Sequence, residues 1–259
     1  MTIRFTYTNR ADTGTLTSLT AATGYPAANV QHPFKTKTYR STGVTDEWLK
    51  WNLGSAQSVT MIAIVNTNLT AAATVYFCGH ASDLGNTTAA WHGTATVDET
   101  ITIPAAGMAI KYFTGASKQW WFLGVAPAGA GTYIEIGRVF FGAYYEPAQN
   151  FAQSYGHSKI DLSSSGISIG GQTHTDVRSQ FNELSLPFPL ISKTQKEELL
   201  AMFAAVGLYR DIIVSLDPSG DLNALTFYGR LTDAVKFKMI AQGSTSELHG
   251  VTLDFRESL

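Results

Sequence analysis

The sequence predicts a mainly β protein, and three observations carry this prediction. Of its 259 residues, 44% are hydrophobic and 15% are charged, so the chain can fill sizeable cores and differs from highly charged helical proteins. Short runs of alternating apolar and polar residues recur along the chain, and breaks containing Gly, Pro, Asn or Asp separate them. One segment, near residues 193–206, shows a convincing helical spacing. Many short strands with one helix favour a sandwich or a barrel.

Charge and composition narrow the expected partners. The formal net charge is −2 and no Lys/Arg-rich run occurs, so the sequence predicts no nucleic-acid readout. No apolar run reaches the roughly 20 residues that cross a bilayer, and the polar N-terminus lacks the apolar core of a secretory signal. We therefore expect a chain that folds in the cytoplasm and does not insert into membranes. The single cysteine, Cys78, lies in the strand-like run TVYFCGH, which favours a buried thiol.

Residues 1–146 are predicted to form a first domain of short strands. We expect these strands at residues 2–8, 47–54, 59–66, 73–80, 100–104, 118–126 and 133–145, with a turn at the intervening GSAQS of residues 54–58. Successive side chains of a strand point to opposite faces. Leu49 and Trp51 therefore share a face, which we expect to be the core face. Trp48 shares the other face with Lys50, and there it either packs under a loop or contacts a ligand.

Several motifs of the first domain form a recognisable series. They are the segment AANV, the YRS that ends a polar loop, the W-L-x-W-N-L-G strand, the run AQSVTMIAIVNTNL, and the closing strands QWWFLGVA and YIEIGRVFFG. Over about residues 20–145 this series resembles the discoidin-like, galactose-binding-like β-sandwich, which is a jelly roll. Members of that family often bind glycans or lipid head groups through loops at one end of the sandwich, so the resemblance implies the same fold and a candidate glycan site.

The loop that corresponds to this site spans residues 31–46. Its candidate ligand contacts are Lys37, Tyr39 and Arg40, together with Trp48 at the start of the next strand. Many relatives have Trp where this chain has Tyr39, so the ligand preference of the family does not transfer directly. The alternative is a solvated basic loop that contacts a neighbouring protein or nothing, because loops are generally polar whatever their role.

A second domain is predicted from residue 147 to residue 259, because the strand pattern breaks at Pro147. Strands are expected within residues 158–171, 177–189, 210–218, 222–231, 234–241 and 247–258. The segment DPSGD at residues 217–221 lacks the ligand spacing of a calcium loop and is expected to be a hairpin turn.

The one amphipathic helix of this domain is predicted near residues 193–206. Ser192 is a good N-cap, Gln195 completes a capping box, and Gly207 suits the residue after the helix. The apolar stripe consists of Leu199, Met202, Phe203 and Val206. We expect this stripe to pack on its own core, and the alternative is a seam between subunits.

The sequence provides little support for enzyme chemistry, and no cofactor or metal is expected. The GISIG of residues 166–170 matches the G-x-S-x-G motif formally, but that motif needs a sharp turn from a strand into a helix. Here Ser168 lies in an alternating strand-like run and no helical pattern follows, so a hydrolase that uses Ser168 is the least favoured hypothesis. None of the six histidines forms an H-x-x-x-H or H-E-x-x-H pair.

The second domain combines a helix beginning S-x-x-Q, an apolar strand, a DP turn and a strand Y-G-R-L-T-D. Over about residues 144–259 this combination resembles components of the tail tips of long-tailed bacteriophages. The resemblance implies a distal tail or baseplate subunit of the virion, assembled in the host cytoplasm as a homo-oligomeric ring, a trimer or a hexamer, that contacts other tail proteins. Edge strands such as residues 158–171 are candidates for pairing between copies.

Two functional hypotheses follow. The first is a non-enzymatic structural tail subunit whose sandwich projects outward as a candidate contact for host-surface glycans. Its candidate inter-subunit ion pairs are Arg210, Arg230, Asp233 and Arg256, and the alternative for each is an ordinary surface charge. The second hypothesis is a free carbohydrate-binding protein that acts through the loop of residues 31–46.

Overall fold

The computed structural model describes residues 2–258, apart from residues 106, 127–130, 221, 223 and 243–246. It contains two compact units. The first comprises Ile3–Tyr145 and Ser215–Thr226, and the second comprises Glu146–Val214 and Phe227–Leu259. Strands dominate both units and the described pairs are antiparallel, which confirms the predicted mainly β fold.

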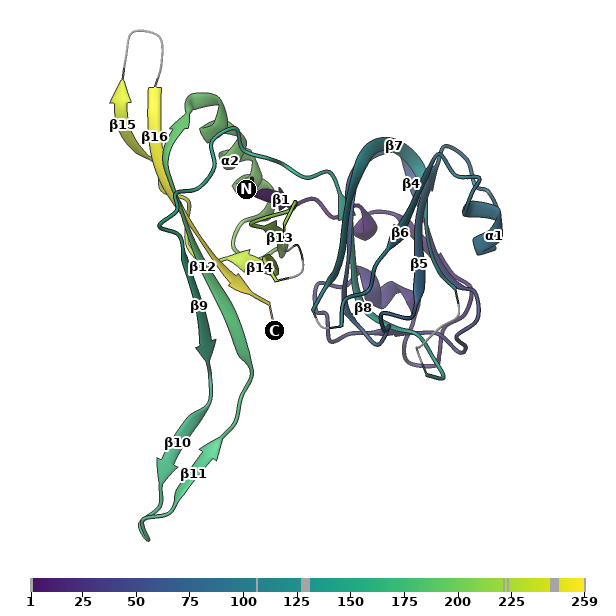
Figure 1. Cartoon of the computed structure of the whole chain (residues 1–259), viewed down its shortest axis with the longest axis horizontal. Helices are drawn as coiled ribbons and strands as arrows, with labels where there is room; N and C mark the ends of the chain where they lie inside the picture. Colours follow the sequence, from purple (N-terminus) through teal and green to yellow (C-terminus); the bar gives the residue numbers. More distant parts are fainter. Residues whose placement is uncertain are drawn as a thin grey trace. The chain divides into compact units, whose positions relative to one another are not determined.

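The first unit is the β-sandwich (Figure 1). Its strands lie in the order β3-β8-β4-β7-β5-β6, and β2 also pairs with β4. The strands of this sheet are β2 (Thr15–Ser18), β3 (Tyr39–Arg40), β4 (Glu47–Thr67), β5 (Thr74–His80), β6 (Val97–Ile101), β7 (Ala109–Ala126) and β8 (Glu135–Gly142). The short strand β1 (Arg4–Thr6) lies outside this sheet. Three short helical turns, η1 (Arg10–Asp12), η2 (Ala27–Gln31) and α1 (Thr88–Trp91), lie in the connections.

The turn expected at residues 54–58 is wrong, because β4 continues through it. The register between β4 and β7 shifts between Asn52 and Gln57, so the extra residues form a bulge in one bent strand. Gly54 lies in this bulge with φ of 74°, a conformation that favours glycine. β4 and β7 stay paired on both sides of the bulge, and both strands arch over the sandwich in Figure 1. The first half of β4 also pairs with β2 and the second half with β8.

Both faces of the strand that carries the two tryptophans are buried. Trp51 belongs to the main core, as predicted, and its ring meets Phe141 edge-on with centroids 5.2 Å apart. Trp48 lies in a second, smaller cluster, which it forms with Cys78, Trp91 and Phe122. Because Trp91 belongs to α1, Trp48 packs under the segment that carries this helix. The predicted burial of the Cys78 thiol is confirmed.

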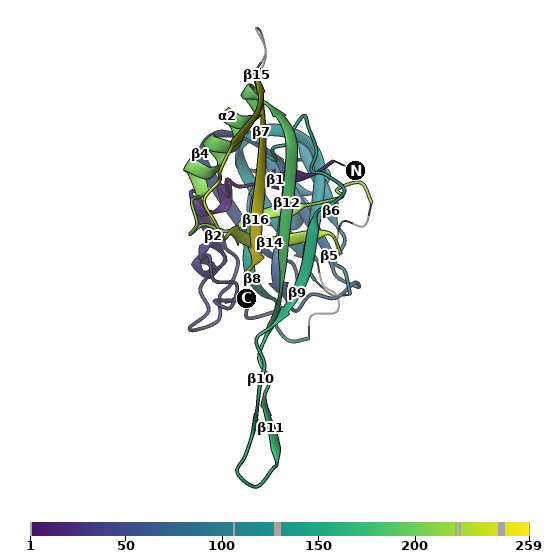
Figure 2. The same cartoon turned by 90° about the vertical axis from the view of Figure 1, so that its left-hand side faces the viewer.

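The second unit consists of a sheet and one long helix. Its strands lie in the order β13-β14-β16-β12-β9, and β15 also pairs with β16 (Figure 2). They are β9 (Gly156–Asp161), β12 (Gln180–Ser192), β13 (Ile212–Ser215), β14 (Thr226–Leu231), β15 (Lys238–Gln242) and β16 (Glu247–Glu257). Leu216 donates its N–H to Leu225 O, so the chain reverses near the predicted turn, whose last residue, 221, lies outside the described residues.

The helix α2 (Lys193–Val206) has the predicted bounds and N-cap, since Ser192 Oγ accepts the N–H of Gln195. The predicted capping box is wrong in its second half. The Gln195 side chain is buried and instead exchanges hydrogen bonds with the backbone of Gln149. The stripe faces the core of its own unit through Leu199, Met202 and Val206, whereas Phe203 is only partly buried.

A hairpin extends away from this sheet, and both views show it (Figures 1 and 2). β9 and β12 pair at its base, and β10 (Ser164–Ile167) pairs with β11 (Thr173–Asp176) further out. We call residues 162–179 the arm. Almost every residue of the arm is exposed to solvent, because neither face of β10 and β11 is covered by another described element.

Candidate functional site

The loop of residues 31–46 presents only some of the side chains that the sequence suggested, because Tyr39 is buried. Lys37 is exposed, but Tyr39 is only 1% exposed and its hydroxyl donates a hydrogen bond to Thr20 O. Burial and the nearby Glu47 carboxylate raise the pKa of Tyr39 above its ordinary value. The ring fills the core beside β8, so the expected stacking of a sugar on Tyr39 is corrected.

Arg40 lies at the rim of the loop and has its partners within the sandwich. Its Nε is 2.8 Å from a carboxylate oxygen of Glu135, which is also its partner in the β3–β8 pairing. The guanidinium carbon lies 4.1 Å from the centroid of the Tyr25 ring and 5.0 Å from that of Tyr133. Arg40 therefore joins three segments of the unit, and any ligand would have to share it with Glu135.

Trp48 is 5% exposed, so it forms no platform for a ligand. Its ring stacks on Phe122 with centroids 5.8 Å apart. Trp48, Tyr39 and Glu47 line a cavity of only about 10 Å³, which is room for about one water molecule. Of the four predicted ligand contacts, Lys37 and Arg40 thus reach the surface, and the two aromatic residues belong to the interior.

Phe34 is the aromatic residue that this loop exposes, and sequence reasoning missed it. Its side chain is 58% exposed, and its ring centroid lies 4.9 Å from that of His32. The N–H of Phe34 donates to Nδ1 of His32, while the N–H of Lys37 donates to Phe34 O. Burial, followed by the charges of Lys37 and Arg138, lowers the pKa of His32. The sequence signal that could have identified Phe34 is the presence of one large apolar residue within an otherwise polar loop.

The sandwich also contains a lysine enclosed by oxygen atoms. Lys50 is buried, and its Nζ donates to both carboxylate oxygens of Asp83, to Gly85 O and to Oδ1 of Asn86. Burial alone would raise the pKa of Asp83, but the hydrogen bonds from Lys50 and from the Gly85 N–H outweigh it and hold the pKa below its usual value. This ion pair ties the segment before α1 to β4. Strand alternation had assigned Lys50 to the face opposite the core face, which is covered here by the segment that carries Asp83 and Asn86.

A second polar cluster surrounds Asp98. Its carboxylate accepts the N–H of Gly93 at 2.7 Å and lies 2.9 Å from Nδ1 of His92. The Cys78 thiol lies 3.3 Å from the same carboxylate, and burial followed by the Asp98 charge raises the pKa of Cys78. A thiol held protonated in this way is a poor nucleophile. The cluster therefore has a structural role in joining β5 to β6.

The four predicted interface charges have partners within the second unit. Arg230 pairs with the buried Asp211 at 3.1 Å, and Asp233 pairs with Lys236 at 3.1 Å. Arg256 lies 3.9 Å from Glu183, with its guanidinium 4.0 Å from the centroid of the Phe181 ring, and Arg210 lies over Tyr209. These contacts account for the charges within one copy, and an inter-subunit role for them stays a prediction.

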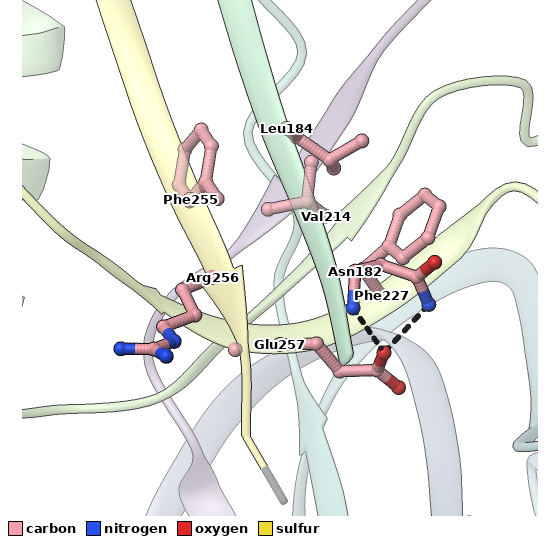
Figure 3. Close-up of a pocket in the computed structure, with 8 residues that line it drawn as sticks. Asn182, Leu184, Val214, Phe227, Phe255, Arg256 and Glu257 are labelled. Atoms are coloured by element: carbon pink, nitrogen blue, oxygen red, sulfur yellow. Dashed lines mark hydrogen bonds between the residues drawn. The ribbon is translucent and has the colours of Figure 1, made fainter. Parts of the chain in front are cut away.

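The described part of the second unit has a small pocket and a more open groove on its sheet. An enclosed pocket of about 10 Å³ has apolar walls that include Leu184, Val214 and Phe255 (Figure 3). At its edge Glu257 accepts hydrogen bonds from the backbone and side-chain nitrogens of Asn182, and this fastens the end of β16 to the start of β12. A more open groove of about 500 Å³ is lined by Gly156, Ser158, Glu183, Ser185, Asp254 and Arg256, among others.

Ser168 lies in the turn at the tip of the arm. Its N–H donates to Gln172 O, and its Oγ accepts the N–H of Gln172. The strand-to-helix turn of a nucleophile elbow is thus not present around this serine. Among the described residues, no group of three or more His, Cys, Asp or Glu side chains is arranged to hold a metal ion, and no helix is long and apolar enough to cross a membrane.

The comparisons with solved structures found carbohydrate-binding modules over about half of this chain. A chitosan-binding module of a chitosanase/glucanase from Paenibacillus sp. IK-5 is 18% identical, with a TM-score of 0.42, over 52% of this chain and 99% of that module. A fucose-binding module from Streptococcus pneumoniae is 8% identical (TM-score 0.42; 52% and 95%). The family 32 module of NanJ from C. perfringens, in complex with galactose, is 15% identical (TM-score 0.41; 54% and 99%). No family model and no curated protein sequence matches the chain.

Proposed function

We propose that this chain is a structural, non-enzymatic subunit that assembles with copies of itself through its second unit. The arm is the observation that carries this proposal. β10 and β11 pair at only four positions, and their outer edges have no partner among the described strands. An isolated two-stranded hairpin is marginally stable in water, and free strand edges attract further strands.

The apolar side chains of the arm support the same proposal. Ile167 is 75% exposed, and Ile169 and Val177 are also largely exposed. Exposed apolar surface of this kind marks an interaction site or an aggregation hazard. A neighbouring subunit that covered the arm would bury these side chains and provide the missing hydrogen-bond partners.

The specific assembly that we propose is the tail tip of a long-tailed bacteriophage. This rests on the resemblance of residues 144–259 to such subunits, which form rings of identical copies. A trimeric or hexameric ring would place the arms between copies, and the sandwich would be a peripheral domain. Other tail proteins would then be further partners, and the virion the site of action.

Light scattering of the purified chain at micromolar concentration tests the proposal. We expect a mass three or six times that of the 28.0 kDa chain. A variant in which residues 163–178 are replaced by a two-residue Asn-Gly turn should be a monomer, and an unchanged near-UV circular dichroism signal from the tryptophans would show that its sandwich is folded. A wild-type chain that stays monomeric throughout the micromolar range would refute the proposal.

A second candidate function is glycan contact by the loop of residues 31–46, and the exposure of Phe34 favours it. An exposed ring beside a lysine suits a sugar, because ligand sites combine aromatic surface with a few polar groups. Titration calorimetry with a panel of oligosaccharides tests this function. Phe34→Ala and Lys37→Ala should each abolish a binding signal that Lys118→Ala, a change in the middle of the β4–β7 pairing, leaves intact. Binding that survives both loop substitutions would place the site elsewhere.

A further inference from the structure

Two groups of exposed apolar side chains in the second unit are candidates for a contact between copies. One group belongs to the arm and consists of Leu162, Ile167, Ile169 and Val177. Another lies near β15 and includes Leu200 and Met239, which is 51% exposed. Figures 1 and 2 both show β15 and the arm at opposite ends of this unit, so no arm can cover the β15 group of its own copy.

The register of the arm gives it two different faces. Ile167 lies opposite Thr173 and Ser165 lies opposite Thr175, so these four side chains share the apolar face. Gly166 lies opposite His174 and Ser164 opposite Asp176, which makes the other face polar. Asp176 is the one acidic side chain of the arm, and its carboxylate pairs with the guanidinium of Arg178 in the same arm at 2.7 Å.

β15 has a matching pair of faces. Met239 lies opposite the buried His249, which places Met239 on the side of the sheet that α2 covers. Phe237 lies two residues before Met239, so strand alternation places it on the same side. Nζ of Lys196 on α2 lies 6.0 Å from the centroid of the Phe237 ring. Leu200 follows Lys196 by one helical turn, so it lies near the same surface. Lys238 lies opposite Gly250 and points to the other side, where it forms no ion pair with a described residue.

The edge of β15 is also open. Among the described strands β15 pairs with β16 alone, and all five of its residues are exposed. Its second edge therefore offers backbone N–H and C=O groups to an incoming strand, as the strands of the arm do. The Lys238 side also carries Ile240, which is 49% exposed and lies next to Gly250. Two open strand edges, each flanked by exposed apolar side chains, can pair with each other.

We propose that the arm of one copy adds to the free edge of β15 in a second copy of this chain. The inference rests on the proposed function and names its contact surface. The Ile167 face of the arm packs over Met239, Phe237 and Leu200, and the Asp176 face meets Lys238 of the other copy. The contact joins two different surfaces, so it repeats head to tail and closes a ring when the rotation between copies permits.

Disulfide trapping tests the contact directly. The double variant Ile167→Cys with Met239→Cys should form covalent multimers on mild oxidation, whereas each single variant and the wild-type chain, whose Cys78 is buried, should not. A covalent dimer from Ile167→Cys alone would show that two arms meet each other, and this outcome would overturn the inference.

Association measurements provide matched controls on the two faces of the arm. Ile167→Ser should weaken self-association about tenfold or more, because it removes a buried isoleucine from the contact, whereas His174→Ser on the polar face should change it little. Asp176→Lys and Lys238→Asp should each weaken association, and their combination should restore it. If the wild-type chain is an oligomer and none of these substitutions weakens its association, the inference is overturned and the proposed function stands. A monomeric wild-type chain would overturn both.

Discussion

The two units of this chain differ in how completely they bury their large apolar side chains. In the sandwich, rings such as Trp51, Phe77 and Phe141 pack together in one enclosed core. Of the described large apolar side chains that are exposed, Leu19 and Phe34 belong to the sandwich and the other ten to the second unit. The sandwich therefore resembles a complete domain, whereas the second unit has surface that a partner can bury. This difference supports the proposal that copies of the chain assemble through the second unit.

The largest effect should come from opening the core of the sandwich. Phe141→Ala removes a fully buried ring that contacts Trp51, Phe77 and Trp121, and should lower the free energy of unfolding by about 3–5 kcal/mol. Phe34→Ala, the matched change at an exposed ring of the same unit, should cost less than about 0.5 kcal/mol. Urea denaturation followed by tryptophan fluorescence measures both changes. Equal effects of the two substitutions would show that the sandwich core is not packed as described.

Lys50→Met should have the next largest effect, about 2 kcal/mol, because it removes the cation that Asp83 and Asn86 surround. Lys37→Met, at an exposed lysine, is the control and should have little effect.

The loss of stability caused by Lys50→Met should depend on pH. The pKa of Asp83 is lowered in the folded state, so its contribution is present above its unfolded pKa of about 4 and is lost as the pH falls through the folded value. The wild-type and Lys50→Met stabilities should therefore converge in acid, and a difference that stays constant below pH 4 would contradict this assignment.

Ser192→Ala should have the smallest of these effects. It removes the hydroxyl that caps α2 and should destabilise the second unit by about 1 kcal/mol. Ser192→Asp, which retains an N-cap acceptor, should preserve stability. Thermal unfolding that separates the two units measures the change. A lowered melting temperature of the sandwich instead would break the distinction drawn between the two units.

Local patterns predicted α2 and the core role of Trp51, because each depends on residues close in sequence. Ser192, the buried stripe and Gly207 define the helix without reference to other segments. The bulge at Gly54 could not be predicted in this way, because Gly and Ser suit a turn and a bulge equally. Only the continuous pairing with β7 distinguishes them.

The candidate site was harder to predict than the fold, since burial there depends on distant segments. Alternation assigned Trp48 and Lys50 to a polar face, but the segment of residues 83–91 covers that face. Tyr39 looked like a loop residue, yet its strand pairs with β8 and its hydroxyl reaches Thr20. The faces of the arm, in contrast, follow from strand alternation once its register is known.

Hydrogen–deuterium exchange of the arm amides tests the central claim most directly. If copies of this chain cover the arm, the amides of residues 164–167 and 173–176 should be protected at high protein concentration and should exchange quickly on dilution. The amides of α2, which lie inside one copy, should be protected at both concentrations. Arm amides that exchange rapidly at every concentration, while α2 stays protected, would contradict the claim that the second unit assembles through the arm.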